Sequence, residues 1–491
     1  MTMRIAIRTD ASIRIGSGHV ARCLALAEAL RDRAATVEFV CRERSGHLCD
    51  AIADRGFAVH RLPPEPEYPA DDADETMAAL SAERRVDWLV VDHYALGAEW
   101  ERRLRPRAER ILAIDDLADR DHDADLLLDQ NYFADAGARY RGRVPPHCGL
   151  LLGPRYAPLR PEFARARAQL RRRDGMVRRV LVCFGGADEH NFTAAALTAL
   201  ARFALERVDV VVGRSNPHAD AIAAFCGAMP QVRLWHPADN MAELMAAADL
   251  SIGAGGGMNW ERACLGLPSL VFATADNQSP VIAALLAGGL ALGRAAVAAP
   301  DAQTIEAALR VACAAPALVQ GLATRSAALT DGRGADRVAA AMLPAPALAL
   351  RPATEDDCLR LHRWRNHPHI LAVSHDPTPI PLDDHRRWFA RTLADPDRRL
   401  LIAESAGTPV GVVRFDIDGD AAKISVYRDP LRTDPVRGLI RAADDWARAH
   451  LPDCRRIVAD VLADNQASLA AFLRAGYHAR QTRLTLELPR P

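Results

Sequence analysis

Residues 8–30 read RTDASIRIGSGHVARCLALAEAL and place a glycine-flanked histidine, His19, between a strand and a helix. The run at residues 4–8 alternates apolar and polar residues, which predicts a strand. After the glycines, apolar residues recur at helical spacing: Val20, Leu24, Ala27 and Leu30. Arg22 falls outside this apolar stripe and is expected on the polar side of the helix. A strand that passes through a glycine loop into a helix predicts a βαβ unit and a parallel sheet.

The alternation of strand and helix patterns continues along two stretches of the chain. In the first stretch, strands are expected at residues 4–8, 37–41, 88–92, 110–114 and 126–129. In the second, they are expected at residues 179–184, 208–212, 232–235, 250–253 and 269–272. Ligands of open α/β sheets bind at the carboxyl ends of strands, so GSGH and the clusters CFGGAD and IGAGGG are expected to face one crevice.

The pattern changes after Leu350, where a hairpin around residues 406–408 and a helix stopped by glycine indicate an α+β domain. The predicted organisation has four parts. They are a first Rossmann-like lobe at residues 1–155, a second at 156–343, a linker at 344–350 and the α+β domain at 351–491.

Composition argues against several classes of protein. The 491 residues carry 62 basic and 63 acidic side chains without a dominant run of one sign, so neither nucleic acid nor a membrane surface is expected as a partner. The ten cysteines form no CxxC pair or zinc-like cluster, and the first residues enter a strand without a secretory signal pattern. We therefore expect a cytoplasmic protein without a metal, and its oligomeric state stays open.

His19 is the leading catalytic candidate. Gly16 and Gly18 allow a ligand to approach the backbone, and the dipole of the following helix disfavours an imidazolium, so His19 is expected to be neutral and able to accept a proton from water. The alternative is an ordinary first-turn histidine beside a tight turn. The glycine spacing matches neither common phosphate-binding pattern.

Polar residues at other strand ends complete the candidate site. Asp10 and Tyr94 join His19 in the predicted catalytic set, and Asp92 is placed with the substrate, although it could instead orient a base or cap a helix. The other predicted substrate contacts are Gly16, Gly18, Asn277 and Gln278. The predicted contacts to a nucleotide, at its pyrophosphate and ribose, are Gly185, Gly255, Gly256, Gly257, Met258 and Glu261. The alternative for the glycines is tight helix–strand packing, and for Glu261 a solvated carboxylate. Asp115 and Asp116 offer too few oxygens for us to expect a metal.

Taken together, the blocks RTDASIRIGSGHVARCLALAEAL, VVDHYALGAEWE, VCFGGADEHN, IGAGGGMNWERACLGLPSL and ADNQ resemble the UDP-sugar hydrolases of pseudaminic acid biosynthesis over residues 3–343. The resemblance implies two lobes of the GT-B glycosyltransferase type. It also implies hydrolysis of UDP-2,4-diacetamido-2,4,6-trideoxy-β-L-altropyranose, with His19 as general base and no cofactor. Gly257 and Met258 stand where this family usually has hydroxyl residues. A UDP-sugar glycosyltransferase and a non-catalytic nucleotide-sugar binding protein remain alternatives.

Residues 348–488 resemble GNAT-type N-acetyltransferases that act on nucleotide-linked amino sugars, with blocks such as LRPATEDDCLRLHRWRN and ADNQASLAAFLRAGY. The resemblance implies acetyl-CoA as cofactor, with Arg432, Arg437, Gly438 and Asn465 as candidate contacts. The usual glycine-rich pyrophosphate loop is replaced by YRDPLRTDPVRG, where Pro435 removes an N–H donor. Phe472 stands where a proton-donating tyrosine often occurs. A structural or substrate-docking role is the alternative to acetyl transfer.

Overall fold

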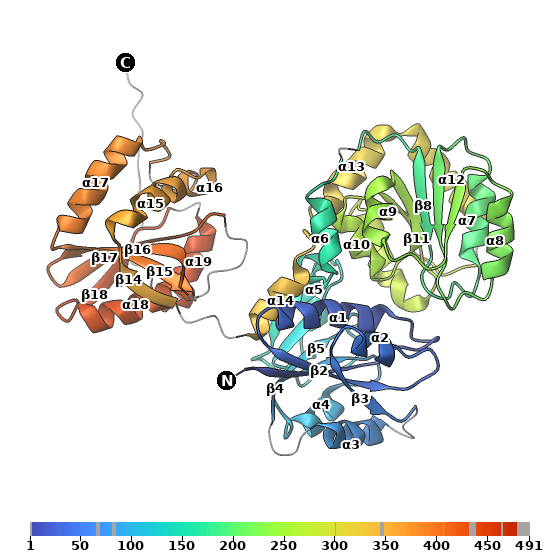
Figure 1. Ribbon diagram of the computed structural model, residues 1–491, viewed down its shortest axis with the longest axis horizontal. Coiled ribbons are helices and arrows are strands. Elements are labelled where there is room, and N and C mark those ends of the chain that lie inside the picture. Colours follow the sequence, from blue (N-terminus) through green and yellow to red (C-terminus); the bar gives the residue numbers. More distant parts are fainter. Residues whose placement is uncertain are drawn as a thin grey trace. The chain divides into compact units, whose positions relative to one another are not determined.

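A computed structural model describes residues 2–64, 69–80, 85–171, 173–299, 301–343, 348–374, 376–405, 407–431, 438–462 and 465–478. The chain divides into two compact units, Met1–Met342 and Leu343–Pro491. Unit 1 holds two parallel sheets and unit 2 holds one mixed sheet (Figure 1).

The first sheet of unit 1 is parallel, with strand order β3-β2-β1-β4-β5-β6-β7. Its strands are β1 (Arg4–Thr9), β2 (Thr36–Arg42), β3 (Ala58–Leu62), β4 (Val86–Asp92), β5 (Ala108–Ile114), β6 (Leu126–Asp129) and β7 (Gly149–Leu152). The helices of this lobe are α1 (Gly18–Arg31), α2 (Cys49–Ala53), α3 (Pro69–Ala79), α4 (Ala98–Leu104), α5 (Ala136–Arg139) and the short η1 (Pro154–Tyr156).

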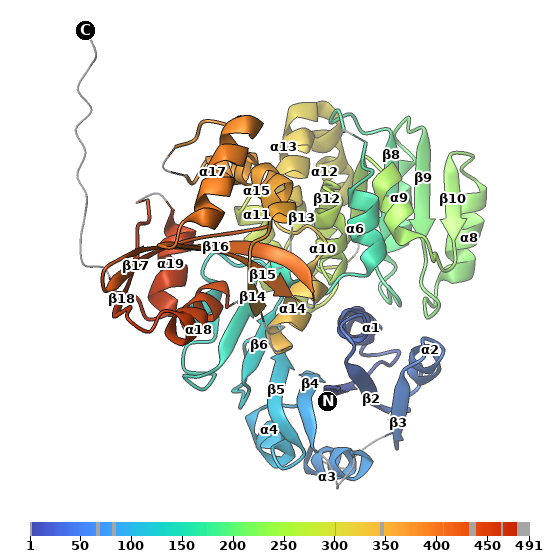
Figure 2. The ribbon, with the colours of Figure 1, turned by 60° about the vertical axis from the view of Figure 1, so that its left-hand side comes forward.

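The second sheet of unit 1 is also parallel, with strand order β10-β9-β8-β11-β12-β13. Its strands are β8 (Arg179–Cys183), β9 (Arg207–Val211), β10 (Val232–Trp235), β11 (Leu250–Ala254), β12 (Ser269–Phe272) and β13 (Leu292–Arg294). The helices are α6 (Pro161–Arg167), α7 (Phe192–Leu200), α8 (Ala219–Gly227), α9 (Met241–Ala247), α10 (Met258–Cys264), η2 (Asp276–Gln278), α11 (Ser279–Ala287), α12 (Ala302–Ala314), α13 (Pro316–Ala327) and α14 (Gly334–Met342). Figure 2 shows β8, β9 and β10 side by side toward one edge of this sheet.

Alternate residues of the central strands pack on opposite faces of the second sheet. Val180 and Val182 join one core with residues of α7, α8 and α12, whereas Leu181 and Cys183 join another with residues of α9, α10 and α11. Burial on both faces explains why these strands are nearly continuous apolar runs. It also explains why the sequence predicted the central strands to within one or two residues.

Both sheets of unit 1 have a topological switch point, where the chain moves from one side of the first strand to the other. In the first sheet it lies between β1 and β4, and in the second between β8 and β11. The carboxyl ends of these pairs carry GSGH and DHY in the first lobe, and CFGG and GAGGG in the second. The predicted fold class is confirmed: two Rossmann-like lobes of the GT-B type precede an α+β domain. The fold therefore places the predicted site residues where open α/β sheets bind ligands.

Helix α14 ends the second lobe but lies against the first. It packs on α1, and the indole Nε1 of Trp88 on β4 donates a hydrogen bond of 2.8 Å to the carbonyl of Met342. Arg33 and Asp336 add an exposed ion pair of 2.7 Å between the same two lobes. Because α1 has the sheet on one side and α14 on the other, most of its residues are buried.

Unit 2 is built on a five-stranded sheet of order β14-β15-β16-β17-β18, antiparallel except for the last pair. Its elements are β14 (Leu348–Pro352), η3 (Glu355–Asp357), α15 (Cys358–Arg365), α16 (Pro368–Leu371), α17 (Leu382–Ala394), β15 (Arg398–Ser405), β16 (Thr408–Asp418), β17 (Ala421–Arg428), α18 (Leu439–His450), β18 (Arg456–Ala459) and α19 (Gln466–Arg474). One face packs on α15 and α17 and the other on α18 and α19 (Figure 1).

The predicted hairpin and the final helix of unit 2 are present as β15–β16 and α19. Residues 348–350, which the sequence placed in the linker, pair with β15 as part of β14. The remaining predicted linker residues, 344–347, lie outside the described residues.

In the described part of the chain, no single helix is long and apolar enough to cross a membrane. One bent pair, α12 with α13, reaches the required length and composition only when the two helices are taken together across a 96° bend.

A buried ion cluster fixes the strand ends of the first lobe. The carboxylate of Asp72 on α3 accepts hydrogen bonds from Arg8 at 2.6 Å, from Arg42 at 2.7 Å and from the indole of Trp100 at 2.9 Å. Although burial acts to raise the pKa of Asp72, the two guanidinium groups hold it below its usual range. Arg8 and Arg42 belong to β1 and β2, so one carboxylate ties α3 to both strands.

Replacing Asp72 with alanine is expected to destabilise unit 1 by about 3–5 kcal/mol, because two buried guanidinium groups lose a shared partner. In differential scanning calorimetry of the full chain, the unit 1 transition should fall by about 5 °C. Asp74→Ala on the same helix is the control, since its carboxylate is 61% exposed and its pair with Arg103 contributes little. Equal shifts for the two variants would contradict a structural role for the cluster.

Candidate active site

The glycine loop between β1 and α1 holds His19 at the switch point of the first lobe. Gly16 has φ of +81°, a conformation that favours glycine, and its N–H donates to the Ser12 carbonyl at 2.8 Å. A Cβ at Gly16 or Gly18 would meet no atom within 4 Å, so the loop is open on that side. The N-cap residue Ser17 makes no side-chain cap. The first N–H groups of α1 are therefore without a side-chain acceptor from the N-cap.

His19 is held by a buried aspartate. Its Nδ1 lies 2.6 Å from Oδ1 of Asp92, which is fully buried at the end of β4. Burial acts to raise the pKa of Asp92, but Arg22 and His19 lower it well below its usual range, so this carboxylate is ionised. An ionised carboxylate only accepts hydrogen bonds, so the 2.6 Å contact to Asp92 favours the proton on Nδ1 and the lone pair on Nε2; Nη2 of Arg22 lies 3.1 Å from the same Nδ1.

Arg22 connects this pair to a second carboxylate. Its Nε and Nη2 each lie 2.6 Å from an oxygen of Asp92, and its Nη1 lies 2.9 Å from Oδ2 of Asp116. Arg22, which the sequence placed outside the apolar stripe of the helix, is only 8% exposed. The sequence contained a signal for the contact between Arg22 and His19. Arg22 follows His19 by three residues on the same helix, which puts both side chains on one face. We call His19, Arg22, Asp92 and Asp116 the histidine cluster.

Tyr94 lies beside the histidine cluster. Its ring meets the His19 ring edge to face, with centroids 4.6 Å apart and an interplanar angle of 81°. The side chain is 37% exposed, so it borders solvent. Burial, and next the charge of Asp116, raise the pKa of the Tyr94 hydroxyl, which is therefore a neutral hydrogen-bonding group at pH 7.

Asp10 and His93 form a second pair of ionisable side chains in the first lobe. Asp10, expected among the catalytic residues, is fully buried, and its carboxylate accepts from Arg8 at 2.6 Å and from the backbone N–H of Arg42 at 2.8 Å. His93 Nε2 lies 3.6 Å from Asp10, and burial, aided by Arg8, lowers the pKa of His93 to about 4. The structure thus places Asp10 as a support of the strand ends and His93 as a neutral neighbour.

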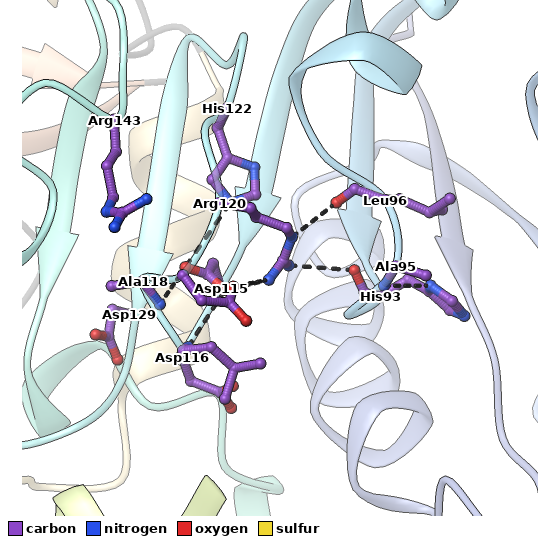
Figure 3. Close-up of polar contacts among 12 residues, drawn as sticks. His93, Ala95, Leu96, Asp115, Asp116, Ala118, Arg120, His122, Asp129 and Arg143 are labelled. Atoms are coloured by element: carbon purple, nitrogen blue, oxygen red, sulfur yellow. Dashed lines mark hydrogen bonds and ion pairs between the residues drawn. The ribbon is translucent and has the colours of Figure 1, made fainter. Parts of the chain in front are cut away.

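Arg120 ties the loop that carries Tyr94 to the end of β5 (Figure 3). Its guanidinium donates to the carbonyls of Leu96 at 3.1 Å and His93 at 3.2 Å, and pairs with Asp115 Oδ1 at 3.0 Å. The oxygens of Asp115 also accept from the backbone N–H groups that follow it, so Asp115 closes its own turn. No group of three or more His, Cys, Asp or Glu side chains suited to a metal ion occurs among the described residues.

His122 completes the network around Asp115. Its Nδ1 lies 2.7 Å from Glu101 and its Nε2 lies 3.7 Å from Asp115. Burial opposes protonation, but the two carboxylates raise the pKa of His122 to about 9. The imidazole is therefore charged at pH 7.

In the second lobe, Gln278 fixes the glycine loop after β11. Its Oε1 accepts from the N–H of Gly255 at 3.2 Å and of Thr274 at 3.1 Å. Gly255 is also required sterically, because a Cβ there would overlap the Ile282 side chain. The Gly255 N–H, expected to bind phosphate, is therefore engaged by Gln278, which itself was expected to bind substrate.

The next glycines are open. A Cβ at Gly256 or Gly257 would meet nothing within 4 Å, and Gly257 begins α10 without a side-chain cap. Met258 packs against the core, with its sulfur 3.7 Å from Cys183, and Gly185 at the end of β8 has φ of +96° with open space beside it. The open glycines are therefore the part of this loop that a ligand can approach.

Two further candidates lie near this loop. Asn277 is exposed in η2, whereas the Glu261 carboxylate is 18% exposed and lies 3.5 Å from Arg160. Burial raises the pKa of Glu261. Among the hydrogen bonds and ion pairs of the described residues, none joins Glu261 or Asn277 to His19.

In unit 2, Gly438 precedes α18 with φ of +81°, and Asn465 caps α19 by accepting from the Ser468 N–H at 3.1 Å. Arg432 and Arg437 lie outside the described residues. Phe472 is buried in the core, and the Tyr477 hydroxyl donates to Asp444 at 2.6 Å. The pairing of β17 with β18 ends at Ile424, so Ser425–Arg428 have no strand partner on that side among the described residues.

Comparisons with known proteins bear on both units. Residues 347–478 match the acetyltransferase (GNAT) domain family, so unit 2 carries a GNAT domain. Over 244 residues, the chain is 29% identical to the UDP-2,4-diacetamido-2,4,6-trideoxy-beta-L-altropyranose hydrolase of Campylobacter jejuni; the match covers 50% of this chain and 81% of that protein. These matches support an enzyme, and they confirm the resemblance seen in the sequence.

Two further proteins are similar to the chain. It is 24% identical over 343 residues to the spore coat polysaccharide biosynthesis protein SpsG of Bacillus subtilis, which covers 69% of this chain and 97% of that protein. The solved structure of MurG from Acinetobacter baumannii is 14% identical and covers 69% of this chain and 99% of that chain, with a TM-score of 0.49.

The stability of unit 1 is expected to depend on the proton of His122. Its folded pKa of about 9 lies above the unfolded value of about 6.5, so its contribution is complete below about pH 6.5 and is lost as pH rises to about 9. We expect the unfolding free energy of the parent to fall more steeply over this range than that of His122→Gln, as measured by denaturant unfolding. His147→Gln, at an imidazole that is 61% exposed, should keep the slope of the parent. Identical slopes for the parent and His122→Gln would contradict the charged state.

Proposed function

We propose that unit 1 hydrolyses UDP-2,4-diacetamido-2,4,6-trideoxy-β-L-altropyranose to the free sugar and UDP. The observation that carries the proposal is the histidine cluster at the switch point, where Asp92 lies 2.6 Å from Nδ1 of His19 and leaves Nε2 for the role of base. The similarity to a hydrolase with this substrate supports the choice of sugar. The function requires the loops of both lobes to bind one molecule.

In the proposed step, His19 Nε2 takes a proton from water as the water oxygen attacks the anomeric carbon. The bond between that carbon and the diphosphate oxygen breaks, and UDP leaves with the bonding electrons. Asp92 acts as the positioning residue for His19 in place of the substrate contact expected from sequence. With a neutral imidazole the histidine cluster has one cation against two carboxylates, so the proton gained by His19 balances its charge.

The second lobe is proposed to hold UDP. Gly256 and Gly257 stand just before α10 with open space beside them, and their backbone N–H groups are proposed for the diphosphate, whose charge grows as the bond breaks. Glu261 is proposed for the ribose hydroxyls, and Asn277 and Tyr94 for the sugar. The step as written uses no metal or cofactor.

His19→Ala is expected to lower the rate of UDP release by about 10²–10⁴-fold, because the general base is removed. UDP is measured from the synthetic sugar nucleotide without an acceptor, with and without a chelator. His147→Ala is the matched control. Release that depends on an added acceptor would indicate a glycosyltransferase. Parent protein that binds UDP without turnover would indicate a binding protein.

We further propose that unit 2 transfers the acetyl group of acetyl-CoA to an amino group of a nucleotide-linked sugar. The match to the GNAT family supports this activity. Bound acetyl-CoA would supply the acetyl group as a thioester. Gly438 precedes α18 with no side-chain cap, so the first N–H groups of the helix can donate to a pyrophosphate, and the edge at Ser425–Arg428 can pair with amide groups of the cofactor.

Gly438→Val is expected to reduce kcat/KM for acetyl-CoA by about tenfold, because a branched residue disfavours φ of +81° where the N–H groups must converge. CoA release is followed in the full chain with a UDP-linked 4-amino sugar. Gly407→Val, at a hairpin glycine with φ of +74°, controls for general strain. A parent that releases no CoA would leave unit 2 with a structural role.

A further inference from the structure

The histidine cluster leaves one carboxylate oxygen without a partner. Oδ2 of Asp116 pairs with Arg22 at 2.9 Å, but Oδ1 is buried and accepts no hydrogen bond from the described residues. The side chain is 15% exposed. A buried carboxylate oxygen that lacks a donor is costly unless a ligand or water supplies one. Asp116 therefore keeps an acceptor oxygen that no described residue uses.

The adjacent aspartate shows the contrast. Asp115 follows the same strand, and its two oxygens are engaged by Arg120, by His122 and by backbone N–H groups of its own turn. Figure 3 shows both side chains at the end of β5. Two carboxylates one residue apart thus have different roles: Asp115 holds the turn together, and Asp116 keeps an oxygen free.

The position of Asp116 points to the reacting end of the substrate. Arg22 binds both Asp116 and Asp92, and Asp92 holds His19. Tyr94, whose ring contacts His19, also lies next to Asp116: after burial, the charge and the hydrogen bonding of the Asp116 carboxylate raise the pKa of the Tyr94 hydroxyl. The free oxygen therefore lies in the same cluster as the base that would activate water.

We propose that Oδ1 of Asp116 accepts a hydrogen bond from the N–H or O–H group on carbon 2 of the substrate sugar. The inference rests on the proposed hydrolysis. Water activated by His19 must reach carbon 1, so the substituent of carbon 2 is the sugar donor nearest to the reacting bond. A hydrogen bond from this substituent strengthens as positive charge develops at carbon 1, so the contact favours the transition state over the bound substrate.

The test compares Asp116→Asn with the parent on two substrates, the 2-acetamido UDP-sugar and its 2-deoxy analogue. Asparagine keeps the size of the side chain but removes the charge that strengthens the hydrogen bond. We expect kcat/KM for the 2-acetamido substrate to fall about 10–100-fold, and the analogue to show little further loss. Inhibition by UDP, which lacks the hexose that carries the 2-acetamido group, should not change. Asp121→Asn, in the same loop and 72% exposed, is the matched control.

An equal loss of kcat/KM on both substrates, together with a shift in the acid limb of the pH dependence of kcat/KM, would overturn the proposal. It would show that Asp116 acts through His19. An unchanged kcat/KM would overturn it as well. To separate this inference from the hydrolysis itself, binding of the 2-acetamido UDP-sugar and of UDP is measured by calorimetry in a His19→Ala background. Asp116→Asn should weaken the binding of the sugar nucleotide about tenfold and leave the affinity for UDP unchanged, even if the parent releases no UDP. Equal affinities would reject the contact.

Discussion

The arrangement of the first lobe depends on a buried guanidinium, that of Arg22. Removing an ion from water is expensive, and in a protein interior the expense is offset only by closely matched opposite charges and hydrogen bonds. Arg22 meets this requirement with three short contacts to two carboxylates from different strands. The same contacts bring the end of β5 to the end of β4, and through Asp92 they hold the ring of His19. Local order at the site is thus a consequence of satisfying one buried charge.

The two lobes use the same topology for different purposes. In each lobe the chain first adds strands on one side of the first strand and then adds strands on its other side. At this switch point, the loops that follow two adjacent strands lead away from each other. In the first lobe these loops carry ionisable side chains, and in the second they carry glycines whose backbone is open. Side chains suit proton transfer and backbone N–H groups suit a phosphate charge, so repetition of one fold supplies two kinds of chemistry.

Much of this organisation follows from sequence, because central strands such as β8 and β11 are buried on both faces and leave continuous apolar runs. Edge strands are less regular: β3 and β7 were not predicted, since they are short and only partly buried. At the site, the loops were predictable from glycines at strand ends, but the partners were not. Asp92 and Asp10 look alike in sequence, yet one meets His19 and the other meets Arg8. Which carboxylate reaches which cation depends on strand order, and a local pattern does not contain strand order.

The return of α14 to the first lobe affects the order in which the chain can fold during synthesis. Helix α1 is made among the first residues, but its outer cover is made only after the whole second lobe has left the ribosome. Until then a largely apolar side of α1 faces water, although the sheet beneath it can already form. The first lobe begins folding first and is completed last. The GNAT domain, which follows immediately after α14, emerges only once the segment that completes the first lobe has been made.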